Sequence, residues 1–381
     1  METVKGFNDY TGEEARKRAE IKKILIQEFE NFGFEPAETP VVEQREFVQG
    51  DNVQDEAVSD IFKLEDRGNR KLALRYEFTF QLKRIAKNKK LPYKRYSIGP
   101  VFRDEPVSGN RFRQFTQCDV DTIGSDIKDE AEVLALVSNV LRKLSISFTI
   151  NINNRKLMNE ILDKENIKEK EKVIKEIDKL DKLSEEEIKE NLSEYDAESV
   201  LEIFKKDENY FKQYDSYSEI EELKKYCKMY NTEVNFQPSL ARGLSYYNGS
   251  VFEIKSDIKE SICAGGSYLV NGMQSTGLSF GLERLSKLSN LKIKNKPILL
   301  ISLGKEKEII NIAQQLRNNN ISCRISFGKI SKNLELANSM KLKYVLILGE
   351  EESKNKKIKL KNMETGEEEL IDINKIIERL K

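Results

Sequence analysis

The spacing of apolar residues predicts a helix near the N-terminus, followed by a series of short strands. Residues 13–32 place Ile21, Leu25 and Phe29 at helical spacing, and Gly33 is suited to end the helix. FEPAETPVVEQREF then begins as an extended segment, and further strand candidates with short turns between them follow at IFKLED, KLALRYE, YKRYSIGPVFRDE and FRQFTQCDVDTIG. Strands in this succession, without helical crossovers, favour an antiparallel sheet over βαβ units.

A charge-dense helical segment interrupts this strand-rich region. A helix from Asp129 to about Leu144 and a strand at ISFTININ precede it, and the segment itself covers about 155–230. Ser184 and Glu187 form a capping-box pattern within it. We interpret most of its charges as solvated. Strands resume at VNFQ and GSVFEIK, and LSFGLERLSKL is assigned to helix.

The pattern changes again after Lys296. PILLISLG, ISCRIS and KYVLILGE read as strands that alternate with helices over KEKEIINIAQQLRN and near NLELANSMK. A hairpin around Thr365 and Gly366 and a short helix end the chain. Since 381 residues exceed one ordinary core, we expect two domains. The fold class is therefore α+β: an antiparallel-sheet domain over 1–296 with a helical insertion, then a small α/β domain over 297–381.

Composition narrows the possible chemistry. Lys+Arg and Asp+Glu both number 65, so a nucleic-acid partner would bind local basic patches and not a strongly basic protein. The chain contains no histidine, which excludes Ser-His-Asp triads, Cys-His dyads and histidine-containing zinc sites. Its four cysteines are widely spaced and form no CxxC pair, so no metal site or disulfide framework is expected. With no membrane span or signal peptide apparent, a cytoplasmic location is expected.

The segment FRDEPVSGNRFRQFTQCDVD concentrates candidate site residues on a strand, loop, strand unit. Alternation along a strand places Arg103 and Glu105 on one face of the first strand. The same rule gives the second strand one face with Phe115, Gln117, Asp119 and Asp121. Guanidinium groups such as those of Arg103, Arg111 and Arg113 bind phosphate oxygens in bidentate fashion. Taken alone, however, an edge hairpin with solvated charges is the favoured interpretation.

Three glycine-containing segments, each taken alone, are compatible with either a ligand site or a purely structural role. GLSFGLERL leads from a strand with Gly277 and Gly281 into a helix with Arg284. CAGGSYLVNG has adjacent glycines that suit either a bulge or the floor of a site. LARGLSYYNG sets Arg242 close to Tyr246 and Tyr247. The glycines would admit a ligand to the backbone, or would simply allow close packing.

Together, and in this order, these segments resemble those of class II aminoacyl-tRNA synthetases, and among them the histidyl-tRNA synthetase family. TPVVE, FRDE with RFRQFTQCDVD, and GLSFGLERL resemble the three class II motifs, and LRYEFT resembles the segment that receives the amino acid's ammonium group. INNRKLM, IDKLDKL and RGLSYYNG resemble segments particular to the histidine enzymes. The resemblance covers nearly the whole chain, because the last 85 or so residues resemble the family's anticodon-binding domain.

The resemblance implies a reaction and its partners. The family activates L-histidine with ATP and Mg²⁺ to histidyl-adenylate, and then transfers the histidyl group to the 3′ end of histidine tRNA. It also implies a homodimer, built through the first motif. Two alternatives stay open: the synthetase-like regulatory subunit of ATP phosphoribosyltransferase, which senses histidine and typically lacks the anticodon-binding domain, and an RNA-binding module of pseudo-synthetase type.

The resemblance further implies roles for individual residues. For catalysis it implies Arg103 and Arg242, which face each other across the α-phosphate. For ATP it implies Arg103, Glu105, Arg111, Arg113, Phe115 and Arg284, and for histidine Glu77, Thr79, Arg103, Gln117, Asp121, Arg242, Tyr246 and Tyr247. The chain departs from the family pattern at Ser245, where Asp is usual, at Tyr76, where Pro is usual, and at Ser267 and Leu269, which replace the Arg and Asp of an RYD sequence.

Overall fold

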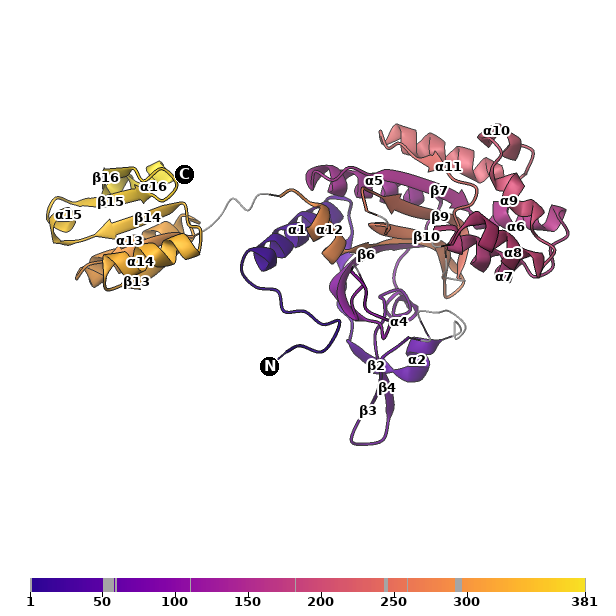
Figure 1. Cartoon of the computed structure of the whole chain (residues 1–381), viewed down its shortest axis with the longest axis horizontal. Coiled ribbons are helices and arrows are strands. Elements are labelled where there is room, and N and C mark those ends of the chain that lie inside the picture. Colours follow the sequence, from indigo (N-terminus) through magenta and orange to yellow (C-terminus); the bar gives the residue numbers. More distant parts are fainter. Residues whose placement is uncertain are drawn as a thin grey trace. The chain divides into compact units, whose positions relative to one another are not determined.

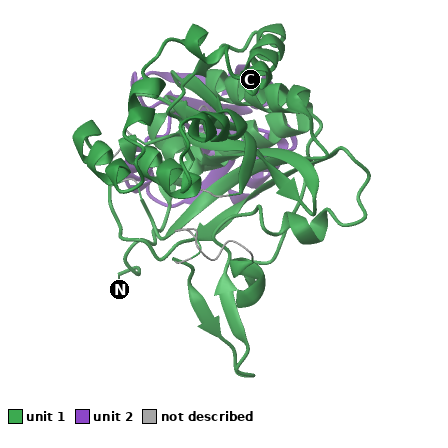
Figure 2. Cartoon of the chain, turned by 90° about the vertical axis from the view of Figure 1, so that its right-hand side faces the viewer, with its two compact units in different colours: residues 1–291 green, residues 292–381 purple. Residues whose placement is uncertain are grey.

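The computed structural model describes residues 2–50, 58, 60–109, 111–181, 183–242, 246–258, 260–291 and 297–380. The chain divides into two compact units, residues 1–291 and 292–381 (Figure 2). Among the described residues, every helix is too short or too polar to cross a lipid bilayer.

The first unit is built on a large, mainly antiparallel sheet. Within the described residues this sheet has eight strands, in the spatial order β1 (Glu35–Pro36), β5 (Tyr93–Phe102), β6 (Gln114–Ile123), β11 (Met273–Gly281), β10 (Cys263–Val270), β9 (Tyr247–Lys255), β7 (Thr149–Asn154) and β8 (Asn235–Phe236). Only the outermost pairs, β1 with β5 and β7 with β8, run parallel within this sheet. The prediction of an antiparallel sheet is confirmed.

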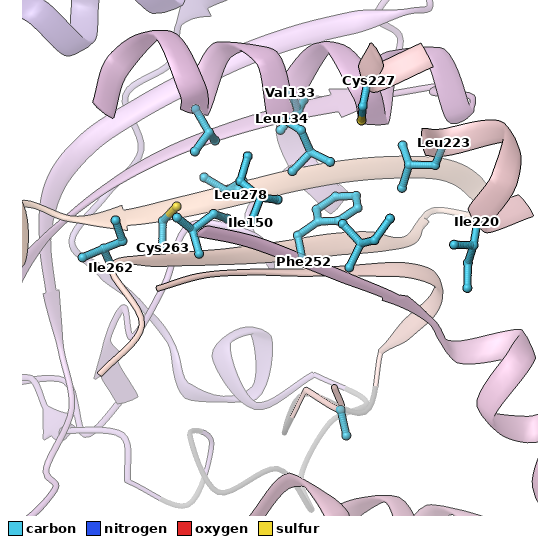
Figure 3. Packing of buried hydrophobic residues seen from close by; sticks show 14 of the residues in the cluster. Val133, Leu134, Ile150, Ile220, Leu223, Cys227, Phe252, Ile262, Cys263 and Leu278 are labelled. Atoms are coloured by element: carbon cyan, nitrogen blue, oxygen red, sulfur yellow. The ribbon is translucent and has the colours of Figure 1, made fainter. Parts of the chain in front are cut away.

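Helices α1 (Gly12–Asn31), α5 (Ile127–Lys143) and α12 (Leu282–Leu288) cover one face of this sheet (Figure 1). Figure 3 shows Val133 and Leu134 of α5 above Phe252 and Leu278 of the strands. The α5 helix begins two residues before the predicted start, because the Asp126 side chain caps it by accepting a hydrogen bond from the Lys128 amide.

The predicted insertion is a set of short helices. They are α6 (Arg155–Lys164), α7 (Lys170–Ile177), a 3₁₀ turn (Asp178–Asp181), α8 (Glu185–Ser193), α9 (Ser199–Phe204), α10 (Glu208–Phe211) and α11 (Tyr217–Met229). The predicted capping box is present: the Ser184 hydroxyl accepts a hydrogen bond from the Glu187 amide, and the Glu187 carboxylate accepts one from the Ser184 amide. Apolar side chains of these helices join the core of the sheet, since Phe211 and Tyr217 contact the Phe236 ring at centroid distances of 5.1 and 5.5 Å.

A smaller sheet projects from the first unit (Figure 1). Its described strands lie in the order β2 (Val42–Gln44), β4 (Lys71–Leu74) and β3 (Lys63–Glu65), with α2 (Arg45–Gln49) and α4 (Leu82–Ile85) nearby. The segment that begins as extended after Gly33 ends in α2, because a helical turn buries Val48 beside Ala73. One sequence prediction was wrong in part. LSFG belongs to β11 and not to a helix, since Leu278 and Phe280 are buried with the period of a strand.

The second unit confirms the predicted α/β pattern. Its described sheet has the order β13 (Cys323–Phe327), β12 (Ile298–Ser302), β14 (Tyr344–Leu348), β15 (Lys357–Asn362) and β16 (Glu368–Asp372). Its helices are α13 (Glu306–Asn318), α14 (Ile330–Ser339), α15 (Glu350–Lys354) and α16 (Ile376–Leu380), with a 3₁₀ turn at Ile373–Lys375. Alternate residues of β12 join two separate apolar clusters, which explains its unbroken hydrophobic run. Gly366, with φ of 80°, lies in the turn of the predicted hairpin between β15 and β16.

Candidate functional site

Strand β6 carries a row of side chains that share one face, as the alternation predicted. The row consists of Phe115, Gln117, Asp119 and Asp121. On β5, the residues opposite these four are, in the same order, Val101, Gly99, Ser97 and Arg95. On β11, the residues opposite Gln117, Asp119 and Asp121 are Gly281, Ser279 and Gly277. Directly opposed residues of an antiparallel pair point to the same face. The row is therefore flanked mostly by small residues, which leave space beside the longer β6 side chains.

The glycines beside this row differ in what they permit. A Cβ atom on Gly277 would lie 2.1 Å from Asp121 Oδ1 and 2.9 Å from the Tyr268 hydroxyl, so close packing excludes a side chain there. A Cβ on Gly266 would lie 2.8 Å from the Tyr247 ring, and the strand register shifts between Gly266 and Tyr268. For Gly281 the nearest atom is 3.8 Å away. Packing thus explains the first two glycines, whereas a methyl group would fit at the third.

Arg103 follows the last residue of β5 and lies at the Phe115 end of the row. Its guanidinium is 5.2 Å from the centroid of the Phe115 ring, and its Nε donates a hydrogen bond of 3.3 Å to the Tyr76 carbonyl. Glu105 lies between two arginines, with carboxylate oxygens 3.9 Å from Arg103 and 3.7 Å from Arg111. These long ion pairs leave guanidinium donors available for a stronger acceptor.

Arg284 approaches the same place from α12. That helix is fixed to the sheet because Glu283 accepts a hydrogen bond from the Thr116 amide at 3.1 Å and forms an ion pair with Arg18 at 2.8 Å. Arg284 itself donates to the Ser261 carbonyl at 2.6 Å. Burial lowers the pKa of Arg284, and Glu260 opposes this effect.

Three arginines act electrostatically on Arg284 at this end of the row. Besides burial, the positive charges of Arg111, Arg103 and Arg242 lower the pKa of Arg284. We refer to Arg103, Arg111, Arg242 and Arg284 as the arginine cluster. Its members come from segments far apart in the sequence, and the positive charge that they place around Arg284 favours an anion there.

Arg242 is held by a carboxylate that the sequence did not reveal. Its Nη1 lies 3.3 Å from Glu253 Oε1, and its buried Nε has no hydrogen-bond partner in the part of the chain that the structure describes. Glu253 also pairs with Lys255 at 3.3 Å and accepts a hydrogen bond from the Ser261 hydroxyl. Glu253 and Ser261 thus connect Arg242 with Arg284. The departure at Ser245 lies outside the described residues.

The opposite end of the row contains acidic groups and tyrosines. We refer to Glu77, Asp121, Tyr246, Tyr247 and Tyr268 as the tyrosine cluster. The Tyr246 ring lies 4.8 Å from that of Tyr247 and 5.4 Å from that of Tyr268. Burial raises the pKa of Tyr247 to about 12, Arg242 lowers it, and Glu77 and Asp121 raise it. Tyr247 therefore lies within reach of both ends of the row.

Asp121 is buried between two partners from neighbouring strands. Arg95 Nη2 lies 2.5 Å from Asp121 Oδ2, and the Tyr268 hydroxyl donates to Oδ1. Asp119 accepts a hydrogen bond of 2.5 Å from Ser279, and burial raises its pKa to about 7 although Arg95 opposes the rise. Sequence reasoning missed Arg95. The available signal was an opposite charge, Asp121, at the facing position of the neighbouring predicted strand.

The remaining candidates have varied surroundings. Gln117 is buried, and its Oε1 has no hydrogen-bond partner among the described residues. Thr79 lies in the turn before α4, where its carbonyl accepts from the Leu82 amide at 3.0 Å. Arg113 pairs with Asp104 at 3.1 Å and donates to the Glu105 carbonyl. Within the described residues no three acidic or cysteine side chains gather to hold a metal ion.

An antiparallel sheet that brings the second and third motif-like segments to one row of side chains is the architecture of a class II aminoacyl-tRNA synthetase catalytic domain. A model of histidyl-tRNA synthetase matches residues 6–285, and a model of an anticodon-binding domain matches residues 298–381. The chain belongs to the histidyl-tRNA synthetase family.

Individual relatives agree over the full length. The chain is 34% identical to histidine–tRNA ligase 1 of Bacillus cereus, over 99% of this chain and 98% of the relative. It is also 34% identical to histidine–tRNA ligase of Wolinella succinogenes, over 96% of this chain and 94% of that one. The crystal structure of histidyl-tRNA synthetase from Nostoc sp. PCC 7120 is similar with a TM-score of 0.86 and 26% identity, covering 100% of this chain and 98% of that chain.

A further structural neighbour bears on the regulatory alternative. It is an ATP phosphoribosyltransferase regulatory subunit/histidyl-tRNA synthetase from Bacillus halodurans, with a TM-score of 0.73 and 20% identity. It covers 88% of this chain, and the chain covers 96% of it. At this identity the similarity shows the shared fold alone.

Proposed function

We propose that this chain activates L-histidine with ATP and transfers the histidyl group to the 3′ end of histidine tRNA. The observation that carries this proposal is the row on β6, with an arginine cluster at one end and buried acidic groups among tyrosines at the other. A substrate pair that is anionic at one end and carries an ammonium and an imidazole at the other would match this distribution of charge. Full-length similarity to histidine–tRNA ligases supports the same activity.

The first step of the proposed reaction, formation of histidyl-adenylate, mainly requires positioned cations. A histidine carboxylate oxygen bonds to the α-phosphorus of ATP, the bond to the bridging oxygen breaks, and pyrophosphate leaves with that electron pair. Negative charge grows on the phosphoryl oxygens as these anions meet, so fixed guanidinium groups stabilise the transition state. We assign Arg103 and Arg242 to opposite sides of the α-phosphate, and Arg284 to the γ-phosphate and adenine.

The other nucleotide contacts follow from the Phe115 end of the row. Phe115, which already lies under the Arg103 guanidinium, would stack on the adenine ring, and Glu105 would accept from the adenine amino group. Arg111 is half exposed and would contact ATP or the acceptor end of tRNA. Arg113 receives the same assignment, although its pairing with Asp104 would first have to loosen.

The tyrosine cluster would receive the amino acid. Glu77 and Thr79 would hold the ammonium group, Glu77 by its charge, and the unpartnered Oε1 of Gln117 is a suitable acceptor for a substrate donor. Asp121 would accept a hydrogen bond from the imidazole N–H, and Tyr247 would meet the other side of the ring. Tyr246 would close the cluster through its ring contacts.

Several partners are part of the proposal. Mg²⁺ would enter with ATP, because this ion commonly uses the substrate phosphates and one or two carboxylates as ligands. The second unit would bind the anticodon, and a homodimer would form through the first motif at 39–43. A cytoplasmic location is proposed with the activity, and the four cysteines, all described, have free thiols.

The test is histidine-dependent exchange of pyrophosphate into ATP, followed by charging of histidine tRNA. We expect both activities. Exchange without charging would restrict the chain to amino-acid activation. The absence of both would favour the regulatory alternative, against which the second unit and its anticodon-binding match already count.

A further inference from the structure

Arg95 is a buried cation that the proposed reaction does not use directly. Among the described residues it is the largest side chain that is fully buried. Its Nη2 contacts Asp121 Oδ2 at 2.5 Å and donates to the Phe78 carbonyl at 3.2 Å. Within the described part of the chain, its Nε and Nη1 have no hydrogen-bond partner. Burying a guanidinium with unsatisfied donors is costly, so the contact with Asp121 must compensate for much of that cost.

The geometry around Asp121 leaves capacity for a ligand. Arg95 occupies one carboxylate oxygen and the Tyr268 hydroxyl donates to the other. A carboxylate offers about four acceptor positions, so a further donor can be accommodated. Gly277 faces Asp121 on β11 and leaves the space that the carboxylate and the Tyr268 hydroxyl fill.

The titratable groups that face Asp121 come from several elements. Arg95 approaches from β5, Asp119 from β6 itself, Tyr247 from β9 and Tyr268 from β10. Glu77, which precedes α4, acts on Asp119 and Tyr247. Burial raises the pKa of Asp121, and the Arg95 guanidinium lowers it. Arg95 is therefore the cation that opposes protonation of this acidic group.

We propose that Arg95 is a positioning residue that sets the specificity for the substrate side chain by keeping Asp121 ionised and oriented as the acceptor for an imidazole N–H. This inference rests on the proposed function, because it deepens the assignment of Asp121. Arg95 acts through Asp121 and does not touch the substrate. Without it, the cation that lowers the pKa of Asp121 would be lost, and protonation of Asp121 would remove the charge that favours a bound imidazole donor.

The experiment measures the histidine KM, the ATP KM and kcat of pyrophosphate exchange from pH 6.5 to 9.5 in the full chain and in Arg95→Met. At pH 7 we expect the histidine KM of the variant to rise on the order of 10- to 100-fold, with the ATP KM nearly unchanged. The ratio of variant to wild-type histidine KM should then fall toward one as rising pH ionises Asp121. Using the ratio removes the titration of free histidine, which is common to both proteins.

Two matched variants separate this role from a structural one. Asp121→Asn should raise the histidine KM by a factor that does not change with pH. Arg95→Met combined with Asp121→Asn should match Asp121→Asn at every pH, because Arg95 acts through Asp121. If Arg95→Met does not fold, this double variant still tests the inference. A double variant with a much higher KM than Asp121→Asn, or an Arg95→Met ratio that is constant with pH, would overturn it.

Direct binding of histidine, measured by calorimetry over the same pH range, separates this inference from the proposed function. Wild-type protein that binds histidine without exchange would contradict the proposed reaction, while a pH-dependent loss of binding in Arg95→Met would still support the role of Arg95. Exchange by the wild type with a pH-independent defect in the variant would contradict the role of Arg95 alone. Wild-type protein that does not bind histidine would overturn both.

Discussion

The arginine cluster and the tyrosine cluster lie at opposite ends of one row on β6, and their charged groups differ in how closely they are paired. At the first end, cations lie near one another in long, partly exposed contacts, as with Arg103 and Arg111 around Glu105. At the second end, the buried Asp121 already has a cation at 2.5 Å and a hydroxyl donor. We therefore propose that a ligand's charge completes the first end, whereas the second end already has a paired carboxylate and would select the substrate side chain through Asp121.

Replacing Arg242 with alanine should show the largest effect at the arginine end. Loss of a cation that acts on the developing phosphoryl charge should slow exchange on the order of 10²- to 10³-fold. The matched control is Arg113→Ala, which removes an arginine already paired with Asp104 and should have a much smaller effect. Both are measured by pyrophosphate exchange with circular dichroism to verify folding. Exchange by Arg242→Ala at a near wild-type rate would show that the cluster does not act on the phosphate.

Replacing Asp121 with alanine tests the tyrosine end. The histidine KM should rise about 10- to 100-fold, because an imidazole N–H would lose its acceptor in a closed site. The ATP KM should change little. The melting temperature should also fall, because Arg95 would remain as a buried cation without its carboxylate. An unchanged histidine KM would contradict the assignment of Asp121.

A pair of glycine substitutions compares the packing at the two ends. Gly277→Ala places a methyl group against the Asp121 carboxylate, and we expect a loss of about 1–3 kcal/mol in the free energy of unfolding. Gly281→Ala meets its nearest neighbour at 3.8 Å and should be close to neutral. Urea denaturation measures both. Equal effects of the two changes would show that the ends are packed alike.

Glu130, on the other face of the sheet, is a buried carboxyl group that can be compared with Asp121. Ser267, where the family usually has arginine, donates a hydrogen bond to Glu130 of α5, and burial raises the pKa of Glu130 to about 7. Since this folded-state pKa exceeds the unfolded value near 4.5, the protein loses stability as pH rises from about 4.5 to 7.

Glu130→Gln should therefore stabilise the protein at pH 8 by at most about 3 kcal/mol, with no gain near pH 4.5. The measurement is denaturant unfolding at both pH values. Asp121→Asn is the contrasting variant, because it should destabilise the protein at pH 8 by leaving Arg95 without its carboxylate. A gain from Glu130→Gln that is equal at both pH values would contradict the raised pKa.

Local pattern predicted most of the architecture. Alternation assigned Phe115, Gln117 and Asp121 to one face of a strand, and the structure places them there. Short segments were assigned less well: LSFG was given both to a helix and to the glycine-containing strand before it, because its four residues are compatible with either period until β6 and β10 pair with it. The segment after Gly33 was predicted to begin as extended, and the helical turn at its end depends on tertiary burial of Val48, which the local pattern does not show.

The candidate site could be predicted from resemblance more than from physical pattern. Nothing local to Arg103, Arg242 or Arg284 indicates that they approach one another, because their proximity depends on strand order. Arg95 escaped prediction for the same reason. Its partner Asp121 is 26 positions later in the sequence, and only the register of β5 and β6 makes them neighbours.

The β6 row also constrains how this protein can change over time. Phe115 and Asp121 are separated by six positions on one continuous strand, a span of roughly 20 Å at the usual rise per residue. Deleting or inserting one residue between them would turn every later side chain to the opposite face. The distance between the arginine cluster and the tyrosine cluster is therefore set by the number of residues between them on β6. A point substitution leaves this spacing unchanged, whereas a length change within the strand would turn the side chains beyond it to the opposite face.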